Sequence, residues 1–289
     1  MLLFFLLSPT AALEASRRGL ALWFDQLLPT LLPFTVLSYV ILQSNLFAST
    51  RFSRQSQHFL TAEEGFVILC GFLFGFPIGS KLTADLYSQK KITKERASVL
   101  FVFTNNLSPV FVTTIFQSQL GYRPGINTYL LLYGIPFLYG ITMLLVHRRQ
   151  LPVPEQKNTT SRFHMDIKII DAGIIHGFET LIKICGYIIL FSLTAELLKM
   201  IPIEAPTIKT LIIGCTEVTN GMPELSAISN PTLQYALAIL FLSWGGMCGL
   251  FQTSSIVSCT DLSMKKYLLT RLFLVSLTML LVMLFQLLL

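Results

Sequence analysis

The sequence predicts an all-α polytopic membrane helix bundle, with about six full spans and two re-entrant helical hairpins in an inverted repeat. Hydrophobic residues make up 53% of the 289 residues, charged residues only 12%, and the mean hydropathy is +0.66. Soluble domains average about 25% charged residues. The net charge of +6 comes from short basic loops, which indicate membrane orientation rather than nucleic-acid binding. We therefore expect contact with a lipid bilayer and no nucleic-acid partner.

Apolar runs of spanning length recur along the chain. A spanning helix needs about 20 apolar residues, and six runs are predicted as full-length helices: 19–47, 97–119, 127–147, 171–199, 232–258 and 267–289. The opening stretch, MLLFFLLSPTAALEA, is apolar but has no basic start. We therefore expect an N-terminal helix that packs on the bundle rather than a cleaved signal peptide.

Two further stretches, 64–87 and 208–228, are apolar at their ends and contain glycine, proline and polar residues in the middle. The polar segment 147–168 is a predicted cytoplasmic linker, because it is rich in Pro, Gln, Asn and Thr. It separates a first repeat, 1–146, from a second repeat, 169–289. Each half has a long helix, a broken segment, a helix with a polar centre and a plain apolar helix. Three spans per half would invert the second repeat relative to the first.

The distribution of positive charge favours hairpins over crossings for the broken segments. The loops on either side of 64–87 both carry basic residues: Arg51, Arg54 and His58 before it, and Lys90, Lys91, Lys94 and Arg96 after it. Basic loops concentrate on the cytoplasmic side, so this segment should enter the membrane and return. The same count leaves Arg17 and Arg18 on the outside, as an exception.

The first broken segment carries the strongest signal for a binding site. Backbone that leaves a helix inside a bilayer exposes polar groups, and it persists only where protein or a watery cavity satisfies them. A half-helix starting near Pro77 would present Gly79, Ser80 and Lys81 to such a cavity, which predicts an anion site. Close glycine packing, a snorkelling Lys81, or an ion pair between Lys81 and Asp85 are the alternatives.

Further polar residues lie at membrane depth in the rest of the chain. The predicted substrate-binding residues outside the first hairpin are Asn105, Asn106, Ser108, Thr219, Asn220 and Gln252. Two adjacent asparagines cannot face one surface, so one should bond freed backbone while the other reaches a ligand or the facing hairpin. Asp85 and Glu217 are the predicted coupling or charge-balancing residues. Glu217 would bind a coupling proton or cation, or would neutralise Lys81. Serine and threonine at this depth often bond only their own helix.

Signals for enzymatic or metal chemistry are missing from the sequence. It contains no HExxH, GxSxG, P-loop or GxGxxG motif. The five cysteines form no CxxC, and the four histidines have no ligand spacing. We expect no catalytic residue, no metal and no cofactor, and we expect the protein not to be an enzyme.

Five motifs in order resemble a known family: RRGLALWFDQLLPTLLPF (17–34), GFPIGSK (75–81), FTNNLSPVF (103–111), EVTNG (217–221) and SWGGMCGLFQ (243–252). At these residues the chain resembles the YlbJ-type sporulation integral membrane proteins of the nucleoside-recognition Gate domain superfamily. Departures from the family pattern are mild and leave the lysine, asparagines and glutamine in place.

The resemblance implies an endospore-forming bacterium and a transporter-like protein of the outer forespore membrane. It also implies a small organic anion as substrate, with dipicolinic acid as the candidate. The sequence leaves two functions open: a transporter of this anion, or a non-transporting membrane scaffold needed for spore maturation. A central polar cavity contacted by Lys81, Asn106, Asn220 and Gln252 would favour transport, whereas a solid glycine-packed core would favour the scaffold.

Overall fold

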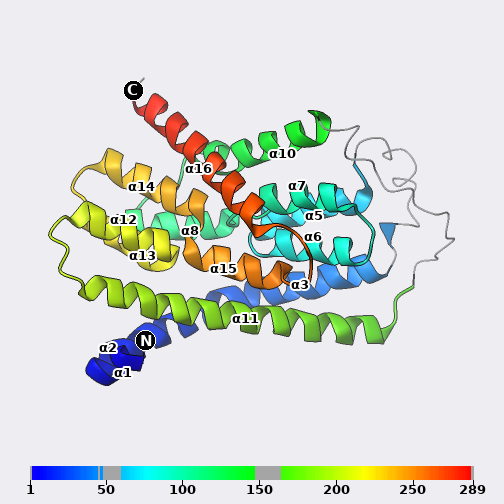
Figure 1. The fold of residues 1–289 in the computed structure, drawn as a ribbon, viewed down its shortest axis with the longest axis horizontal. Helices are drawn as coiled ribbons and strands as arrows, with labels where there is room; N and C mark the ends of the chain where they lie inside the picture. Colours follow the sequence, from blue (N-terminus) through cyan, green and yellow to red (C-terminus); the bar gives the residue numbers. More distant parts are fainter. Residues whose placement is uncertain (1, 45, 48–59, 147–163, 288–289) are drawn as a thin grey trace.

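A computed structural model describes residues 2–44, 46–47, 60–146 and 164–287. Helices form the whole fold of these residues, which contain no β-strand, and most helices run along one long axis (Figure 1). The predicted all-α fold class is therefore confirmed. Much of the linker 147–168 and the basic residues Arg51, Arg54 and His58 lie outside the described residues.

Five helices are long and apolar enough to cross a membrane: Pro9–Gln43, Ile126–Val146, Ile167–Met200, Pro231–Val257 and Met264–Gln286. Several of them contain shorter elements, which are α2 (Pro9–Leu22), η1 (Trp23–Leu27), α3 (Leu28–Gln43), α9 (Ile126–Tyr129), η3 (Leu130–Gly134), α10 (Ile135–Val146), α11 (Ile167–Met200), α14 (Pro231–Trp244), α15 (Gly246–Val257) and α16 (Met264–Leu287). A short helix, α1 (Leu2–Leu7), precedes α2.

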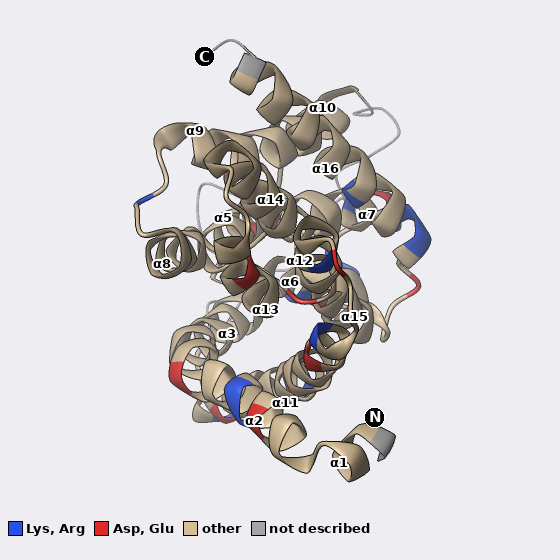
Figure 2. Cartoon of the chain, turned by 90° about the vertical axis from the view of Figure 1, so that its left-hand side faces the viewer, with Lys and Arg blue, Asp and Glu red and all other residues tan. Residues whose placement is uncertain are grey.

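The first long helix and α11 pack as an antiparallel pair on one side of the bundle, as the end-on view in Figure 2 shows. The indole Nε1 of Trp23 donates to the Leu181 carbonyl at 2.8 Å. A Cβ on Gly19 would lie 3.2 Å from the Ile189 Cα, so the glycine permits this close approach. Phe4, Ala12 and Ala15 of the opening stretch form a buried cluster with Leu193 of α11, so the N-terminal helix packs on the bundle, as predicted.

The first predicted hairpin folds as two helices, α5 (Ala62–Phe74) and α6 (Ile78–Ser88), around a break at Gly75–Pro77. Gly75 has φ of +79°, which favours glycine. The arms approach closely, because a Cβ on Gly71 would lie 3.2 Å from the Gly79 Cα. Thr61 and Glu64 form a capping box that fixes the start of α5.

The second predicted hairpin consists of α12 (Pro206–Thr216) and α13 (Val218–Glu224), followed by a 3₁₀ turn, η4 (Leu225–Ala227). Its arms are closer still, since a Cβ on Gly221 would overlap the backbone of Gly214. Both broken segments are therefore helix pairs around a break; the first lies within two residues of its predicted bounds, and the second does so when η4 is included. Their re-entrant position in a membrane stays a prediction.

One predicted continuous helix is wrong, and another keeps its length as a candidate span but contains a break. The run 97–119 is split into α7 (Lys94–Phe103) and α8 (Pro109–Leu120), and it is not long enough to count as a span. Pro109 restricts the preceding residue to an extended conformation, and Ser108 has ψ of 149°. The run 232–258 bends at Gly245 and Gly246, which have φ of +81° and +73°. The described chain thus has five candidate spans rather than six.

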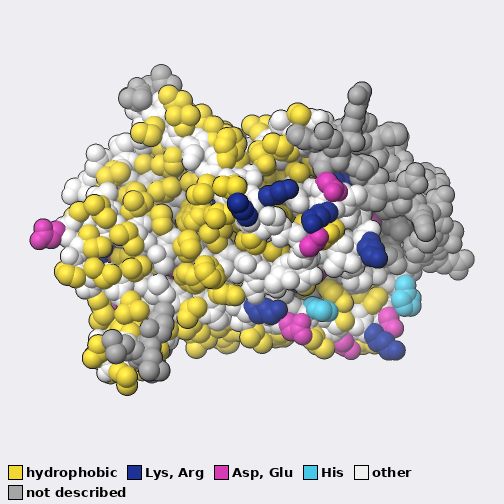
Figure 3. All heavy atoms as spheres, in the orientation of Figure 1, with side chains coloured by type: hydrophobic (Ala, Val, Ile, Leu, Met, Phe, Trp, Pro, Cys, Tyr) yellow, Lys and Arg dark blue, Asp and Glu magenta, His cyan; other side chains and the backbone are white. Residues whose placement is uncertain are grey.

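The described parts of the basic loops gather at one end of the bundle. The Lys91 ammonium donates to the Leu42 carbonyl at 2.9 Å, and Lys94 pairs with Asp261 at 2.5 Å. Figure 3 shows most charged side chains of one face toward this end, with hydrophobic side chains over much of the remainder. Both ends of the first hairpin lie here, as the charge count predicted. Arg18, the predicted exception, pairs with Glu196 at 2.6 Å near the far end of α11.

The order of elements is the same in the two halves: a long helix, a helical hairpin, a broken helix and a final long helix. In Figure 1 the first hairpin lies in one half of the long axis and the second hairpin in the other. Each hairpin is surrounded by its own hydrophobic cluster. The opposite membrane orientation of the two halves stays a prediction.

Candidate functional site

The tip of the first hairpin reaches both helix breaks. The backbone N–H of Phe76 donates to the Asn106 carbonyl, in the break between α7 and α8. The Phe76 ring lies 3.2 Å from a Cβ built on Gly249, just beyond the break between α14 and α15. The tip of the second hairpin meets this latter break as well, because the Trp244 indole donates to the Cys215 carbonyl at 3.0 Å. The two hairpins and the two breaks therefore meet in one region.

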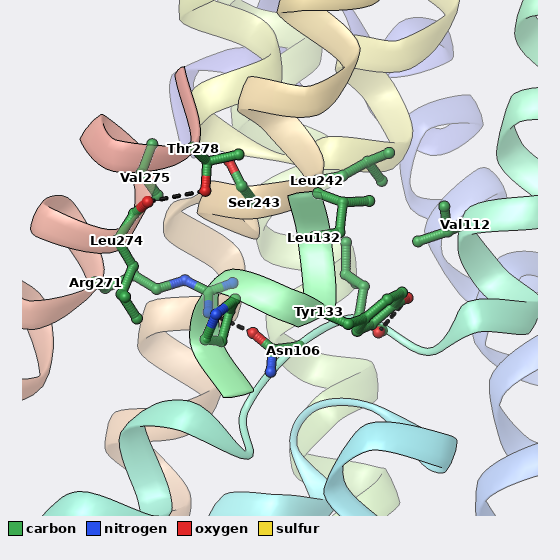
Figure 4. Close-up of a pocket in the computed structure, with 12 residues that line it drawn as sticks. Asn106, Val112, Leu132, Tyr133, Leu242, Ser243, Arg271, Leu274, Val275 and Thr278 are labelled. Carbon is green, nitrogen blue, oxygen red and sulfur yellow. Dashed lines mark hydrogen bonds between the residues drawn. The ribbon is translucent and has the colours of Figure 1, made fainter. Parts of the chain in front are cut away.

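A buried arginine lies in this region. Arg271, in α16, is 3% exposed, and its Nη1 donates to Asn106 Oδ1 at 2.9 Å and to the Asn105 carbonyl at 3.2 Å (Figure 4). It forms no ion pair with any carboxylate in the part of the chain that the structure describes. Its Nε has no hydrogen-bond partner among those residues. A full positive charge is thus held at the break by neutral groups alone.

The two neighbouring asparagines have different partners, as the sequence predicted. Asn106 donates from Nδ2 to the Phe103 carbonyl at 2.7 Å, which satisfies backbone freed at the end of α7. Asn105 donates from Nδ2 to Thr253 Oγ1 at 2.9 Å and to the Tyr267 hydroxyl at 2.7 Å. It therefore binds α15 and α16 rather than the facing hairpin. Its Oδ1 accepts no hydrogen bond from the described residues.

A small cavity adjoins the arginine. Arg271, Asn106, Tyr133, Ser243 and Thr278 contribute the polar part of its lining, and aliphatic side chains contribute the rest (Figure 4). The cavity has room for about one water molecule. Because its walls are mostly apolar, an opposite charge that entered would interact strongly with the guanidinium.

Lys81 is directed away from this cavity. Its Nζ lies 2.6 Å from Asp85 Oδ1, which is the ion-pair alternative left open by the sequence. The pair lines a second cavity, between α3, α6 and α11. Gly79 packs against Thr104, and Ser80 is fully buried with an Oγ that has no partner among the described residues. Direct substrate contact by these three residues stays a prediction.

The polar residues of the second hairpin form a local cluster. The Glu217 carboxylate accepts the backbone N–H of Asn220 at 2.7 Å, its Nδ2 at 2.8 Å and the Thr219 hydroxyl. Glu217 therefore caps α13, and the partner of Lys81 is Asp85. Thr219 and Asn220 also line a third and larger cavity, with Arg18 among its other lining residues.

The last two predicted site residues have local partners. Ser108 caps α8 by accepting the Phe111 N–H at 3.1 Å. Gln252 is buried and donates from Nε2 to Cys248 Sγ at 3.1 Å. Lys81, Asn106 and Asn220 lie in three different cavities, and Gln252 lines none of the three. The single shared cavity that was expected is therefore not found in the described part of the chain.

Sequence reasoning missed Arg271 and the buried pair of Arg96 with Glu64, whose side chains are 2% and 0% exposed. The signal for Arg271 was its position inside the apolar run 267–289, where an ionisable residue is a functional candidate by default. Lys265 and Lys266 lie just before it and were assigned to the preceding basic loop, whereas Arg271 was left within the predicted helix without a role.

Five apolar helices, an interior polar region and a basic end define the class of protein: this is an integral membrane protein, a polytopic helical bundle. The chain is 27% identical to "Sporulation integral membrane protein YlbJ" of Bacillus subtilis (strain 168) over 310 aligned residues, which cover 91% of this chain and 75% of that protein. The similarity supports a YlbJ-type sporulation membrane protein, in agreement with the predicted family.

No family model matches the chain, so membership of the Gate domain superfamily stays a prediction. No solved structure matches it either. Within the described residues no group of three or more His, Cys, Asp or Glu side chains is placed to hold a metal ion.

Proposed function

We propose that the protein is a transporter, not an enzyme, and that it moves a small organic anion across the membrane during sporulation. Dipicolinate, pyridine-2,6-dicarboxylate, is the first candidate because of the family resemblance, which also favours the outer forespore membrane. The observation that carries the proposal is Arg271, a buried cation in a candidate spanning helix without a carboxylate partner among the described residues.

The chemistry of arginine suits this role. A charge at membrane depth is costly and is retained where it pairs with another charge or serves a pathway. The planar guanidinium presents a fork of donors that matches a carboxylate. In Arg271 the Nε donor is unused by the described residues, while Nη1 is held by the α7–α8 break. A carboxylate bound at Nε would supply the missing acceptor and the missing negative charge.

The surrounding elements provide a means of access. The cavity beside Arg271 is too small for a pyridine dicarboxylate, so binding requires the neighbouring elements to separate. Both hairpin tips adjoin this region, and helical hairpins that meet at broken helices are typical of transporters. The larger third cavity reaches the second hairpin at Asn220 from the other end of the bundle.

The direct test is uptake of labelled pyridine-2,6-dicarboxylate into proteoliposomes. Arg271→Gln removes the charge but retains a polar side chain, and uptake should fall to the level of protein-free liposomes. Arg271→Lys retains the charge without the fork and should give intermediate uptake. Arg17→Gln makes the same chemical change at an exposed position and should transport like the wild type.

Membrane insertion of each variant would be measured by its recovery in the membrane fraction. Thermal stability would be measured by size-exclusion chromatography of the solubilised protein after heating. Wild-type uptake by a correctly inserted Arg271→Gln variant would contradict the proposal.

The scaffold remains the second candidate, because one observation favours it. The arms of both hairpins are in glycine-mediated contact, at Gly71 with Gly79 and at Gly214 with Gly221, as in a tightly packed core. If the scaffold is correct, the wild-type protein will give no uptake above protein-free liposomes. Arg271→Gln would then lower thermal stability and spore maturation together.

A further inference from the structure

Lys81 and Asp85 form an ion pair one helical turn apart on α6, the returning arm of the first hairpin. Their Nζ and Oδ1 atoms are 2.6 Å apart, and the side chains are 23% and 21% exposed. The pair lines the second cavity, which lies between α6, α3 and α11 and has room for about one water molecule. The proposed anion site at Arg271 does not use this pair.

Three hydroxyl groups on the two facing helices line the same cavity: Thr35 and Ser38 on α3, and Thr180 on α11. Each donates its proton to a carbonyl of its own helix, at 2.8, 2.6 and 2.9 Å respectively. A hydroxyl that donates its proton still has lone pairs that can accept. Their oxygens are therefore available acceptors for a cationic donor on α6.

Two other titratable groups face the pair across the cavity. α3 contributes Tyr39 and α11 contributes His176, and their rings stack with centroids 4.9 Å apart. The His176 Nδ1 also lies 3.6 Å from Glu179. The remaining elements packed against α6, which are α5, α7 and α15, contribute no described side chain to the lining. The cavity thus contains one ammonium and one carboxylate in an otherwise neutral hydroxyl environment, with His176 at its side.

We propose that the Lys81–Asp85 pair is the proton-coupling site of the transporter and that Asp85 takes up the proton. This inference rests on the proposed transport function. A proton from the aqueous side adds to the Asp85 carboxylate and forms a neutral carboxylic acid. The Lys81 ammonium keeps its own protons but loses its charged partner. It then donates to the hydroxyl oxygens of α3 and α11, because a partly buried ammonium without acceptors is unfavourable.

Protonation therefore changes what the first hairpin binds. With Asp85 ionised, the pair is neutral and its bonds stay within α6. With Asp85 protonated, Lys81 bonds across to the antiparallel α3–α11 pair, and the Lys81–Asp85 pair carries one net positive charge. That charge and the charge of Arg271 together match a dicarboxylate dianion. Uptake of one proton therefore changes both the contacts of the first hairpin and the positive charge that balances the anion.

Two measurements on proteoliposomes separate coupling from binding, with labelled pyridine-2,6-dicarboxylate as the probe. The first is exchange of labelled for unlabelled anion at equal pH on both sides. The second is accumulation driven by a pH gradient. Asp85→Asn mimics the protonated acid but cannot release a proton, so it should retain exchange and lose accumulation. Asp85→Glu keeps a titrating carboxylate and should retain both.

The matched control is Asp261→Asn, which removes the acid of the exposed Lys94–Asp261 pair and should leave both measurements unchanged. If Asp85→Asn fails to insert, Asp85→Ser tests the same inference, because it also removes the titrating carboxylate and should retain exchange without accumulation.

Several results would overturn the inference. They are gradient-driven accumulation by Asp85→Asn, loss of exchange as well as accumulation in an inserted Asp85→Asn protein, or wild-type accumulation that ignores the pH gradient. A wild-type protein that exchanges no anion would instead refute the transport function, and the inference with it. The two failures are distinguishable because exchange at equal pH needs no coupling.

Discussion

Replacing Glu64 with glutamine should destabilise the protein strongly, because it removes the carboxylate charge that pairs with the buried Arg96 side chain. Glu64 and Arg96 form a two-point ion pair in which Nη2 lies 2.7 Å from Oε2, and the side chains are 0% and 2% exposed. Glutamine keeps a carbonyl oxygen that can accept the Thr61 N–H of the capping box, so the change isolates the charge. Removal of one member of a buried pair costs about 3–5 kcal/mol.

A second variant, in which Arg96 is replaced as well as Glu64, provides the comparison for Glu64→Gln. Glu64→Gln combined with Arg96→Met removes both charges and keeps the side-chain acceptor of the capping box, so no buried charge is left without its partner. We therefore expect the double variant to recover most of the stability that Glu64→Gln loses. The free energy of unfolding would be measured by titration with sodium dodecyl sulfate, followed by circular dichroism. A Glu64→Gln variant as stable as the wild type, or a double variant no better than the single one, would refute the reasoning.

Two further predictions concern packing and pH. Gly221→Ala should destabilise the second hairpin by about 1–3 kcal/mol, because its Cβ would overlap the facing backbone of α12. As the control, Gly186→Ala should be neutral or slightly stabilising, because its Cβ would meet no atom within 4 Å. Thermal unfolding of the two variants checks this prediction. Hydrogen bonds from Lys94 and Tyr87 lower the pKa of Asp261. The contacts of Asp261 with Lys94 and Tyr87 should therefore form at neutral pH and be lost as the pH falls through that lowered pKa. At low pH, amide hydrogen exchange in these loops of the wild type should match that of the Asp261→Asn variant. If Asp261→Asn leaves loop exchange unchanged at neutral pH, the prediction is contradicted.

The hairpins were predictable because their signals are local. Glycine and proline within apolar runs predict breaks, and basic loops on both sides of 64–87 predict that both ends lie at one end of the bundle. The contact of Lys91 with Leu42 and of Lys94 with Asp261 agrees with this. The glycines at 245, 246 and 249 indicate either close helix contact or a further break, and the structure has a break at Gly245 and Gly246. At Pro109 the surrounding hydrophobicity outweighed the same kind of signal, so that break was read as part of a continuous helix.

Side-chain direction was not predictable from the same signals. Ser80 and Lys81 are neighbours in sequence, yet helical geometry separates them by about 100° around α6. Ser80 is consequently buried within the bundle, while Lys81 lines the cavity beside α3 and α11. The pairing of Glu64 with Arg96 across 32 residues depends on how α5 and α7 pack. Sequence reasoning therefore found the elements that build the site but not which cavity each side chain enters.

The position of Arg271 links the two halves physically. A Cβ on Gly245 would lie 3.8 Å from Arg271 Nη2, so the guanidinium lies between the α7–α8 break and the α14–α15 break. The Phe76 tip contacts both breaks, and a Cβ on Gly246 would lie 3.2 Å from the Thr216 carbonyl at the other tip. Displacement of either hairpin would therefore change the surroundings of Arg271 through one or two contacts. A charge placed at this junction responds to both hairpins, which a charge on a peripheral helix face could not do.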